Sequence, residues 1–328
     1  MCPFSRPASI RDSVALQPVD ILTPGCQTIE VLADKLQTLR EIIGSYGSCL
    51  VAYSGGVDSV FLARVAADVL GPKSLAVIAD SPSLPRRELA DALEIARQFQ
   101  IPVRVVQTAE FENPDYLSNP TNRCYFCKHE LFTELTPLAR AEGFAVIAYG
   151  ENASDIGDFR PGSKAAGEFQ VRAPLKEAGL TKGDIRALSA QLGLPTADKP
   201  QMACLSSRIP YGEAVTVEKL RMIEQAENVL RDLGFYDVRV RHHQLPPRSL
   251  PLSTGSATLA RSNPSQALPT EAGALARIEV GLAEVPRLLD EKMREAVATK
   301  LKEIGYIHVT VDLEGYRRGS LNQNHGLA

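Results

Sequence analysis

Four short apolar runs alternate with longer amphipathic stretches between residues 49 and 149, and this alternation constrains the fold more than any other feature. The runs are typical of buried parallel strands and lie at 49–53, 75–79, 103–107 and 145–149. The stretches between them have helical periodicity and lie at 59–70, 86–99 and 129–142. Strands that alternate with helices of this length predict an α/β fold with an open, doubly wound parallel sheet, whose ligands bind at the carboxyl ends of the strands.

Two further helices are expected beside this core. One covers residues 31–43, where apolar residues recur with helical spacing. The other covers residues 182–192, where Thr181 and Asp184 form a capping pair. Residues 1–28 contain several prolines and no periodicity, which predicts a disordered N-terminal extension outside the fold.

The length of 328 residues predicts two domains. The first spans 29–210, and a second, smaller α/β domain spans 211–328. Within the second domain, residues 244–273 combine five prolines with almost no apolar periodicity, which predicts a mobile insertion. Two similar helix-to-strand patterns flank this insertion, because residues 233–240 resemble residues 304–311.

Charge and hydropathy argue against several classes of protein. The 36 lysines and arginines are balanced by 39 aspartates and glutamates, which gives a net charge of −3 and a pI near 6.0. No global positive field is available to hold a nucleic acid, so that partner would need a local patch. No apolar run approaches the roughly 20 residues that cross a bilayer, and the first residues lack the apolar centre of a signal peptide. We therefore expect a soluble, cytoplasmic protein without a membrane partner.

A glycine-containing loop, Ser54–Ser59, follows the first predicted strand and opens the first predicted helix. Gly55 and Gly56 let backbone N–H groups turn inward around an anion, and the helix N-terminus adds its positive end. The two serines can donate hydrogen bonds to phosphate oxygens, whereas Asp58 is suited to positioning Mg²⁺. No lysine follows the glycines, so this is not the common mononucleotide loop. The alternative is an ordinary turn in which Asp58 caps the helix.

This hexapeptide resembles the signature of the PP-loop ATP-pyrophosphatase superfamily, whose members activate a carbonyl with ATP and release pyrophosphate. The resemblance implies that adenine lies near Asp80 and Ser81, after the second strand, and near Gly150 and Asn152, after the fourth. The alternative for these residues is turn chemistry, which Asn, Asp and Ser also favour.

Three of the six cysteines lie in polar surroundings: the CxxC pair Cys124 and Cys127, and Cys204. Tetrahedral zinc needs further ligands, and the sequence has neither a second CxxC nor a paired histidine motif. Three thiolates can instead hold a [4Fe–4S] cluster with one iron open. Nearby cations are expected to favour thiolate over thiol, namely Arg123, Lys128 and Arg208. The alternative is a set of buried free cysteines, which we accept for Cys2, Cys26 and Cys49.

Four segments together are similar to the LarE-type ATP-dependent sulfur transferases, namely Ser54–Ser59, Arg123–Lys128, Asp155–Gly162 and Cys204–Gly212. The similarity covers about residues 30–243 and 275–318. Enzymes of this family make the thiocarboxylate groups of the nickel-pincer nucleotide cofactor of lactate racemase. The resemblance implies that a carboxylate of pyridinium-3,5-biscarboxylic acid mononucleotide is adenylated with Mg-ATP and is then attacked by sulfur.

In that family Cys204 matches the position of the sulfur-bearing cysteine. One branch sacrifices this side chain, which becomes dehydroalanine, whereas another branch has three cysteines and carries the transferred sulfide on an iron–sulfur cluster. Because Cys124 and Cys127 accompany Cys204, the sequence resembles the second branch. The resemblance also suggests a ring-like homo-oligomer.

A predicted helix over 217–233 leads into a strand over 237–243 that places Arg239 and Arg241 on one face. Two arginines at this spacing can clamp a phosphate or carboxylate. The family resemblance assigns them to the substrate phosphate, adds Arg208 as a substrate contact, and suggests two divalent-metal ligands, Glu227 and Glu279. The alternative is a solvated, charged strand face.

Three other functions compete with sulfur transfer to a carboxylate. A tRNA thiolase of the same superfamily also combines the phosphate loop with three cysteines, but such enzymes usually have positive RNA-binding surfaces. An amidating synthetase is less favoured, because the three cysteines would have no role in its reaction. A non-catalytic ATP-binding sensor would bind ATP without forming AMP.

Overall fold

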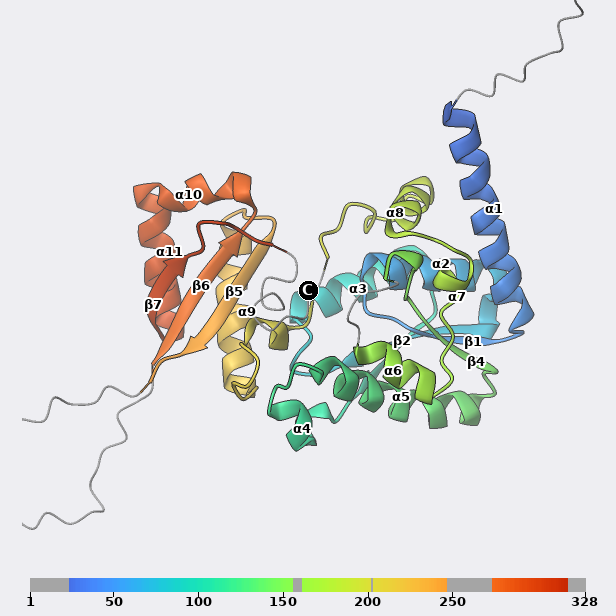
Figure 1. Cartoon of the computed structure of the whole chain (residues 1–328), viewed down its shortest axis with the longest axis horizontal. Coiled ribbons are helices and arrows are strands. Elements are labelled where there is room, and N and C mark those ends of the chain that lie inside the picture. The colour runs from blue at the N-terminus through green and yellow to red at the C-terminus, as the bar shows by residue number, and fades with distance from the viewer. Residues whose placement is uncertain (1–23, 156–160, 202, 247–272, 318–328) are drawn as a thin grey trace, which may run out of the picture.

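The computed structural model describes residues 24–155, 161–201, 203–246 and 273–317, and Figure 1 shows their arrangement. Most of the predicted extension 1–28, with Cys2, and most of the predicted insertion 244–273 lie outside the described residues. Most of the family motif Asp155–Gly162 also lies outside them.

The helix and the strand that border the predicted extension and the predicted insertion reach into these two segments. Helix α1 (Pro24–Ser45) begins four residues before the predicted end of the extension. Proline is tolerated in a first helical turn because its missing N–H would have no partner there. Strand β5 (Val238–Gln244) includes the first residue of the predicted insertion. Leu245 N donates to Gly273 O at 2.8 Å, so the two ends of the insertion meet.

The first sheet has four parallel strands in the order β3-β2-β1-β4. They are β1 (Cys49–Ala52), β2 (Ser74–Asp80), β3 (Val103–Gln107) and β4 (Val146–Tyr149). The chain moves outward from β1 to β3 and then returns to the other side of β1. The predicted α/β fold with a parallel, doubly wound sheet is confirmed, and the strand order reverses between β1 and β4, where such sheets bind ligands.

Helices cover both faces of this sheet (Figure 1). One face packs against α1, α2 (Val57–Leu70), α3 (Arg86–Gln98) and α8 (Lys182–Gln191). The other packs against α5 (Arg123–Glu142) and α6 (Pro161–Glu168). Thr181 and Asp184 form the predicted capping box of α8. Two further short helices are α4 (Pro114–Leu117) and α7 (Pro174–Glu177).

Helix α5 begins six residues earlier than its predicted start at residue 129. Its first turn therefore carries Cys124 and Cys127, which the prediction left in a loop. The Asn122 side chain makes no capping hydrogen bond, and Cys124 and Cys127 line a cavity, so no capping side chain marks the helix start.

The second sheet has the order β5-β6-β7, with β5 antiparallel and β7 parallel to β6. The flanking strands are the two that the sequence similarity indicates: β5 follows α9 (Val217–Asp232), and β7 (Tyr306–Val311) follows α11 (Glu291–Ile304). Both connections pass through a glycine with positive φ, Gly234 at 85° and Gly305 at 118°. The central strand β6 (Ala274–Val280) was not predicted.

This sheet has a core of its own, to which α9, α11 and the short α10 (Val285–Leu289) contribute. The domain limits 29–210 and 211–328 stay a prediction, although the two sheets have separate cores. No helix within the described ranges is long and apolar enough to cross a bilayer.

A smaller apolar cluster joins the two sheets. It is formed by residues of α4, of the segment between Cys204 and α9, and of α9 itself, namely Tyr116, Leu205, Ile209, Val215, Leu220 and Ile223. An ion pair of 2.6 Å between Arg87 of α3 and Asp232 of α9 crosses the same junction. The segment that carries Cys204 is therefore packed where the two sheets meet.

Candidate functional site

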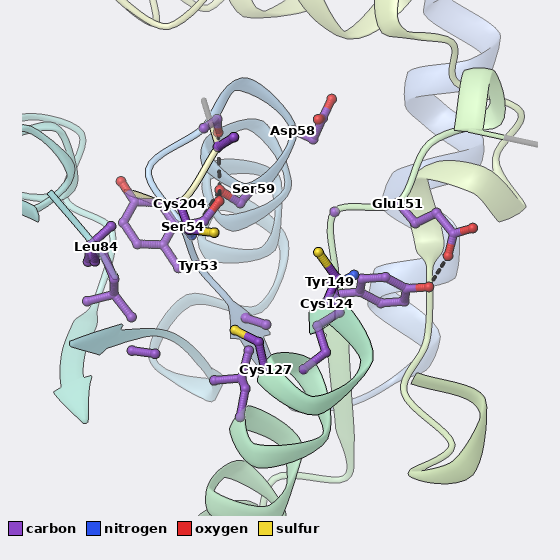
Figure 2. A pocket seen from close by; sticks show the side chains of 18 of the residues that line it. Tyr53, Ser54, Asp58, Ser59, Leu84, Cys124, Cys127, Tyr149, Glu151 and Cys204 are labelled. Atoms are coloured by element: carbon purple, nitrogen blue, oxygen red, sulfur yellow. Dashed lines mark hydrogen bonds between the residues drawn. The ribbon is translucent and has the colours of Figure 1, made fainter. Parts of the chain in front are cut away.

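A cavity of about 560 Å³ opens at the carboxyl ends of the first sheet's strands. It is lined by the Ser54–Ser59 loop, the loops after β2 and β4, the first turn of α5 and the segment ending at Cys204. Figure 2 shows the sulfur atoms of Cys124, Cys127 and Cys204 around the same cavity as Ser54 and Ser59. Because the cavity lies at the point where the strand order reverses, the topology places a ligand there.

The phosphate loop has the conformation that an anion site requires. Gly55 has φ of 71°, and a Cβ there would lie 2.6 Å from the Cβ of Ala92, so only glycine fits. Ser59 Oγ accepts a hydrogen bond from Ser54 N at 3.1 Å and donates to Gly56 O at 3.1 Å. Because the N-cap of α2 is Gly56, no side chain of the cap occupies the first N–H groups, which are left for an anion.

Asp58 does not cap helix α2, whose N-cap residue is Gly56. It is the second residue of α2, and its carboxylate lies 2.6 Å from Lys182 Nζ and accepts from Asn152 Nδ2 at 3.4 Å. The alternative interpretation of Asp58 as a helix cap is therefore wrong. Lys182 also lines the cavity and was missed in the sequence, where it is visible only as the first residue of α8.

The loop after β4 approaches α2 closely. A Cβ at Gly150 would lie 3.1 Å from both Asp58 Cβ and Ser59 N, so glycine is needed for this approach. Gly150 and Asn152 both line the cavity, and their contact with adenine stays a prediction.

The two residues expected after β2 are in different surroundings. Ser81 lines the cavity, and its hydroxyl lies 2.9 Å from that of Ser83. Asp80 is instead 2.6 Å from Arg86 and accepts from Gln107 Nε2 at 3.1 Å. It is not among the residues that line the cavity, so its predicted contact with adenine is not supported by its position.

All three candidate cysteines are free thiols on the cavity wall. Burial holds the pKa of the Cys127 thiol well above its ordinary value, and the neighbouring Glu110 carboxylate acts in the same direction, while Arg123 opposes them. The expectation that nearby cations favour the thiolate is therefore wrong for Cys127, because burial outweighs them. Cys49 is buried in β1, as expected.

The donor set fits a [4Fe–4S] cluster in kind, because three free thiols line one cavity. Within the described part of the chain, however, no three histidine, cysteine, aspartate or glutamate side chains converge as a ready metal site. The three thiols would have to approach one another to hold a cluster.

Arg208 is fully buried and holds the backbone of Cys204 in place. Its Nη1 donates to Ala203 O at 2.6 Å and to Cys204 O at 2.9 Å. Its Nε and Nη2 donate to the two carboxylate oxygens of Glu227, at 2.8 and 3.1 Å. The predicted substrate contact is therefore corrected: Arg208 has no exposed surface with which to reach a substrate.

Glu227 is equally buried and is surrounded by hydrogen-bond donors rather than by metal ligands. Besides Arg208, it accepts from Arg231 at 3.2 Å and from Val240 N at 3.1 Å. Burial alone would raise the pKa of Glu227, but the arginines outweigh it and hold that pKa below its ordinary value. Its predicted role as a divalent-metal ligand is thus replaced by a buried ion pair.

The predicted role of Glu279 as a divalent-metal ligand is also replaced by a buried ion pair. It is 1% exposed, and its two oxygens accept from Arg241 Nε and Nη2 at 3.0 and 2.9 Å. Arg277 adds a third hydrogen bond at 3.0 Å. A carboxylate that accepts three hydrogen bonds from two guanidinium groups is held in a buried ion pair, which replaces the predicted metal site.

Arg239 and Arg241 are buried, so the alternative of a solvated strand face is wrong. Arg239 Nη2 donates to Gln201 O at 2.6 Å, and Arg241 Nη1 donates to Ser207 O at 2.8 Å. Both side chains therefore bind the segment on either side of Cys204, and neither is among the residues that line the cavity.

The doubly wound sheet, the glycine loop opening α2, and the acidic and basic groups beside it define an ATP-pyrophosphatase of the PP-loop class. Comparison with known proteins identifies the family within this class. The chain is 32% identical over 293 residues to pyridinium-3,5-bisthiocarboxylic acid mononucleotide synthase of Lactiplantibacillus plantarum, covering 89% of this chain and 95% of that protein. The chain belongs to the LarE-type family of ATP-dependent sulfur transferases.

Other relatives agree with this placement. An uncharacterized protein of Synechocystis is 42% identical over 293 residues, which is 89% of this chain and 98% of the relative. The tRNA-specific 2-thiouridylase MnmA of Xanthobacter autotrophicus is 31% identical over 215 residues, covering 52% of this chain and 54% of that enzyme. No protein-family model matches the chain.

Proposed function

We propose that this protein converts a carboxylate of pyridinium-3,5-biscarboxylic acid mononucleotide into a thiocarboxylate, toward the nickel-pincer nucleotide cofactor of lactate racemase. One observation carries the proposal: the phosphate loop and three free cysteines line the same cavity. A nucleotide that activates a carboxylate and a sulfur that attacks it would then meet without diffusion of the intermediate.

In the first step the substrate carboxylate attacks the α-phosphate of ATP, which forms an acyl-adenylate and releases pyrophosphate. The Ser54–Ser59 loop would bind the phosphates through its N–H groups and serines. Mg²⁺, when bound, would neutralise charge on the phosphates, and Asp58 would hold it. Lys182 already places a cation beside Asp58, and we assign it to the developing charge of the pyrophosphate.

In the second step sulfur attacks the acyl carbon and AMP leaves. If Cys204 supplies this sulfur, its thiolate forms a thioester with the substrate; loss of the Cα proton and cleavage of the Cβ–S bond then release the thiocarboxylate and leave dehydroalanine at position 204. In the alternative, Cys124, Cys127 and Cys204 would hold a [4Fe–4S] cluster that supplies sulfide, and Cys204 stays intact. Arg208 keeps the backbone of Cys204 fixed during this step. Arg239 and Arg241 bind the same segment on either side of Cys204, so we assign them to positioning Cys204 in place of the substrate phosphate.

The second candidate is a tRNA thiolase, which the similarity to MnmA favours. That similarity covers only about half of either chain, and the net charge of −3 provides no general attraction for RNA. Retention of tRNA at moderate salt would support this candidate.

The test incubates anaerobically prepared protein with Mg-ATP and the dicarboxylated pyridinium mononucleotide. We expect AMP and thiolated product, and mass spectrometry of the Cys204 peptide separates the two sulfur sources. Dehydroalanine at Cys204 indicates sacrificial transfer, whereas an intact Cys204 indicates sulfide carried on a cluster. Cys204→Ala should abolish product, while Cys49→Ala, which changes a cysteine away from the cavity, should retain it. ATP binding without AMP would refute the proposal and favour a sensor.

A further inference from the structure

Glu110 is a buried carboxylate in the cavity that no step above uses. It begins the short turn η2 (Glu110–Glu112) after β3, lines the cavity and is 2% exposed. One of its oxygens accepts a hydrogen bond from Ser83 Oγ at 3.4 Å. Its other oxygen, Oε2, is buried and has no hydrogen-bond partner among the described residues.

A buried carboxylate oxygen without a partner is costly, because its lost hydration is not replaced. Such an oxygen on a cavity wall therefore indicates a missing ligand group that is positively charged or donates a hydrogen bond. Phosphate is excluded as that group by like-charge repulsion.

Glu110 lies at the sulfur end of the cavity. Its charge adds to burial in raising the pKa of the Cys127 thiol. Its hydrogen-bond donor, Ser83, also accepts from Leu205 N at 2.8 Å through its backbone oxygen, and Leu205 directly follows Cys204. A carboxylate that reacts at Cys204 must bring the ring to which it is bonded into this end of the cavity.

We propose that Glu110 recognises the cationic pyridinium ring of the substrate and selects it over uncharged rings. This inference rests on the proposed function, because it identifies the ring as the group that arrives beside Cys204. The positive charge of an N-ribosyl pyridinium spreads over the ring carbons, so Oε2 can contact it through a polarised ring C–H or through the ring face. Thr108 and Leu131 line the same cavity and can pack against the ring.

The test compares two probes that differ in ring charge, nicotinamide mononucleotide and its reduced, uncharged form. Neither carries a carboxylate, so binding is measured by calorimetry without turnover. We expect the wild-type protein to bind the cationic probe about tenfold more tightly, the size of one charge-assisted contact. Glu110→Gln should reduce this preference to nearly one. Glu112→Gln is the matched control, because Glu112 is exposed in the same turn, and it should keep the preference.

Ser83→Ala provides a second variant, because it removes the hydrogen bond to Glu110 and keeps the carboxylate. It should retain the preference for the cationic probe. The inference is overturned if wild type binds neither probe, if it binds both equally, or if Glu110→Gln keeps the preference. Selective binding through Glu110 without any thiocarboxylate formed from the dicarboxylated substrate would instead refute the proposed function alone.

Discussion

The buried pair of Arg208 and Glu227 allows a prediction with a magnitude. Neither side chain is exposed, and the pair is joined by two hydrogen bonds of 2.8 and 3.1 Å. Glu227→Gln keeps the size of the side chain but leaves the Arg208 charge buried without its carboxylate. Removing one partner of a buried pair typically destabilises a protein by about 3–5 kcal/mol. We expect a loss in this range.

Urea unfolding followed by circular dichroism measures this loss as a shift of the midpoint at unchanged slope. Arg231→Gln is the matched control, because Arg231 contacts the same carboxylate at 3.2 Å but is partly exposed, and we expect it to lose about 1 kcal/mol or less. Because Arg208 also binds the backbone of Cys204, the Glu227 variant should react faster with a thiol reagent at Cys204. A Glu227→Gln protein within about 0.5 kcal/mol of wild type would refute this reasoning.

Three further predictions concern the phosphate loop, the cavity lysine and the second sheet. Gly55→Ala should weaken ATP binding, measured by calorimetry, at least tenfold, because a Cβ there would lie 2.6 Å from Ala92 and φ is 71°. Gly167→Ala is the control, because its added Cβ meets no atom within 4 Å, and it should bind ATP like the wild type. Equal ATP binding by both variants would contradict the predicted clash. Lys182→Met should slow pyrophosphate release at least tenfold in a coupled phosphate assay, because it removes the cation beside Asp58, and an undiminished rate would rule out its role. Burial lowers the pKa of His242 to about 4, so unfolding binds a proton between that value and about 6.5, and stability is lost as pH falls through this window. We expect a loss of up to about 2 kcal/mol between pH 7 and pH 5 in urea unfolding, and a smaller loss for His242→Gln; an unchanged slope in this variant would contradict the assignment.

The parallel strands could be predicted to within two residues. Strands β1, β2 and β4 are short apolar runs. Strand β3 was found from its valines, although at the edge of the sheet it is partly exposed. The start of α5 could not be predicted, because no capping side chain marks it. Strand β6 was missed because its charged residues, Arg277 and Glu279, interrupt an apolar run. In the structure Glu279 is paired with Arg241 of β5, and Arg277 with Asp312, which follows β7.

Part of the candidate site could be predicted from the sequence, and part of it could not. The phosphate loop and the three cysteines could be found from the sequence, because glycine spacing and thiols identify their own chemistry. The partners of charged side chains could not, since Lys182 and Asp58 are 124 residues apart and Arg241 and Glu279 are 38 apart. The family resemblance suggested Glu227 and Glu279 as metal ligands, and the sequence could not show the arginines that the structure places against both.

The segment around Cys204 is fixed by hydrogen bonds from both halves of the molecule. Leu205 N donates to Ser83 O, which follows β2 of the first sheet, while Arg241 of β5 donates to Ser207 O and Glu227 of α9 accepts from Arg208. The domain is consequently not the unit that can be exchanged between relatives. A chimaera that joined residues 1–210 of this chain to the second half of a relative would keep Cys204 but replace the residues that orient it. Such a hybrid needs Glu227, Arg241 and their contacts transferred together with the cysteine.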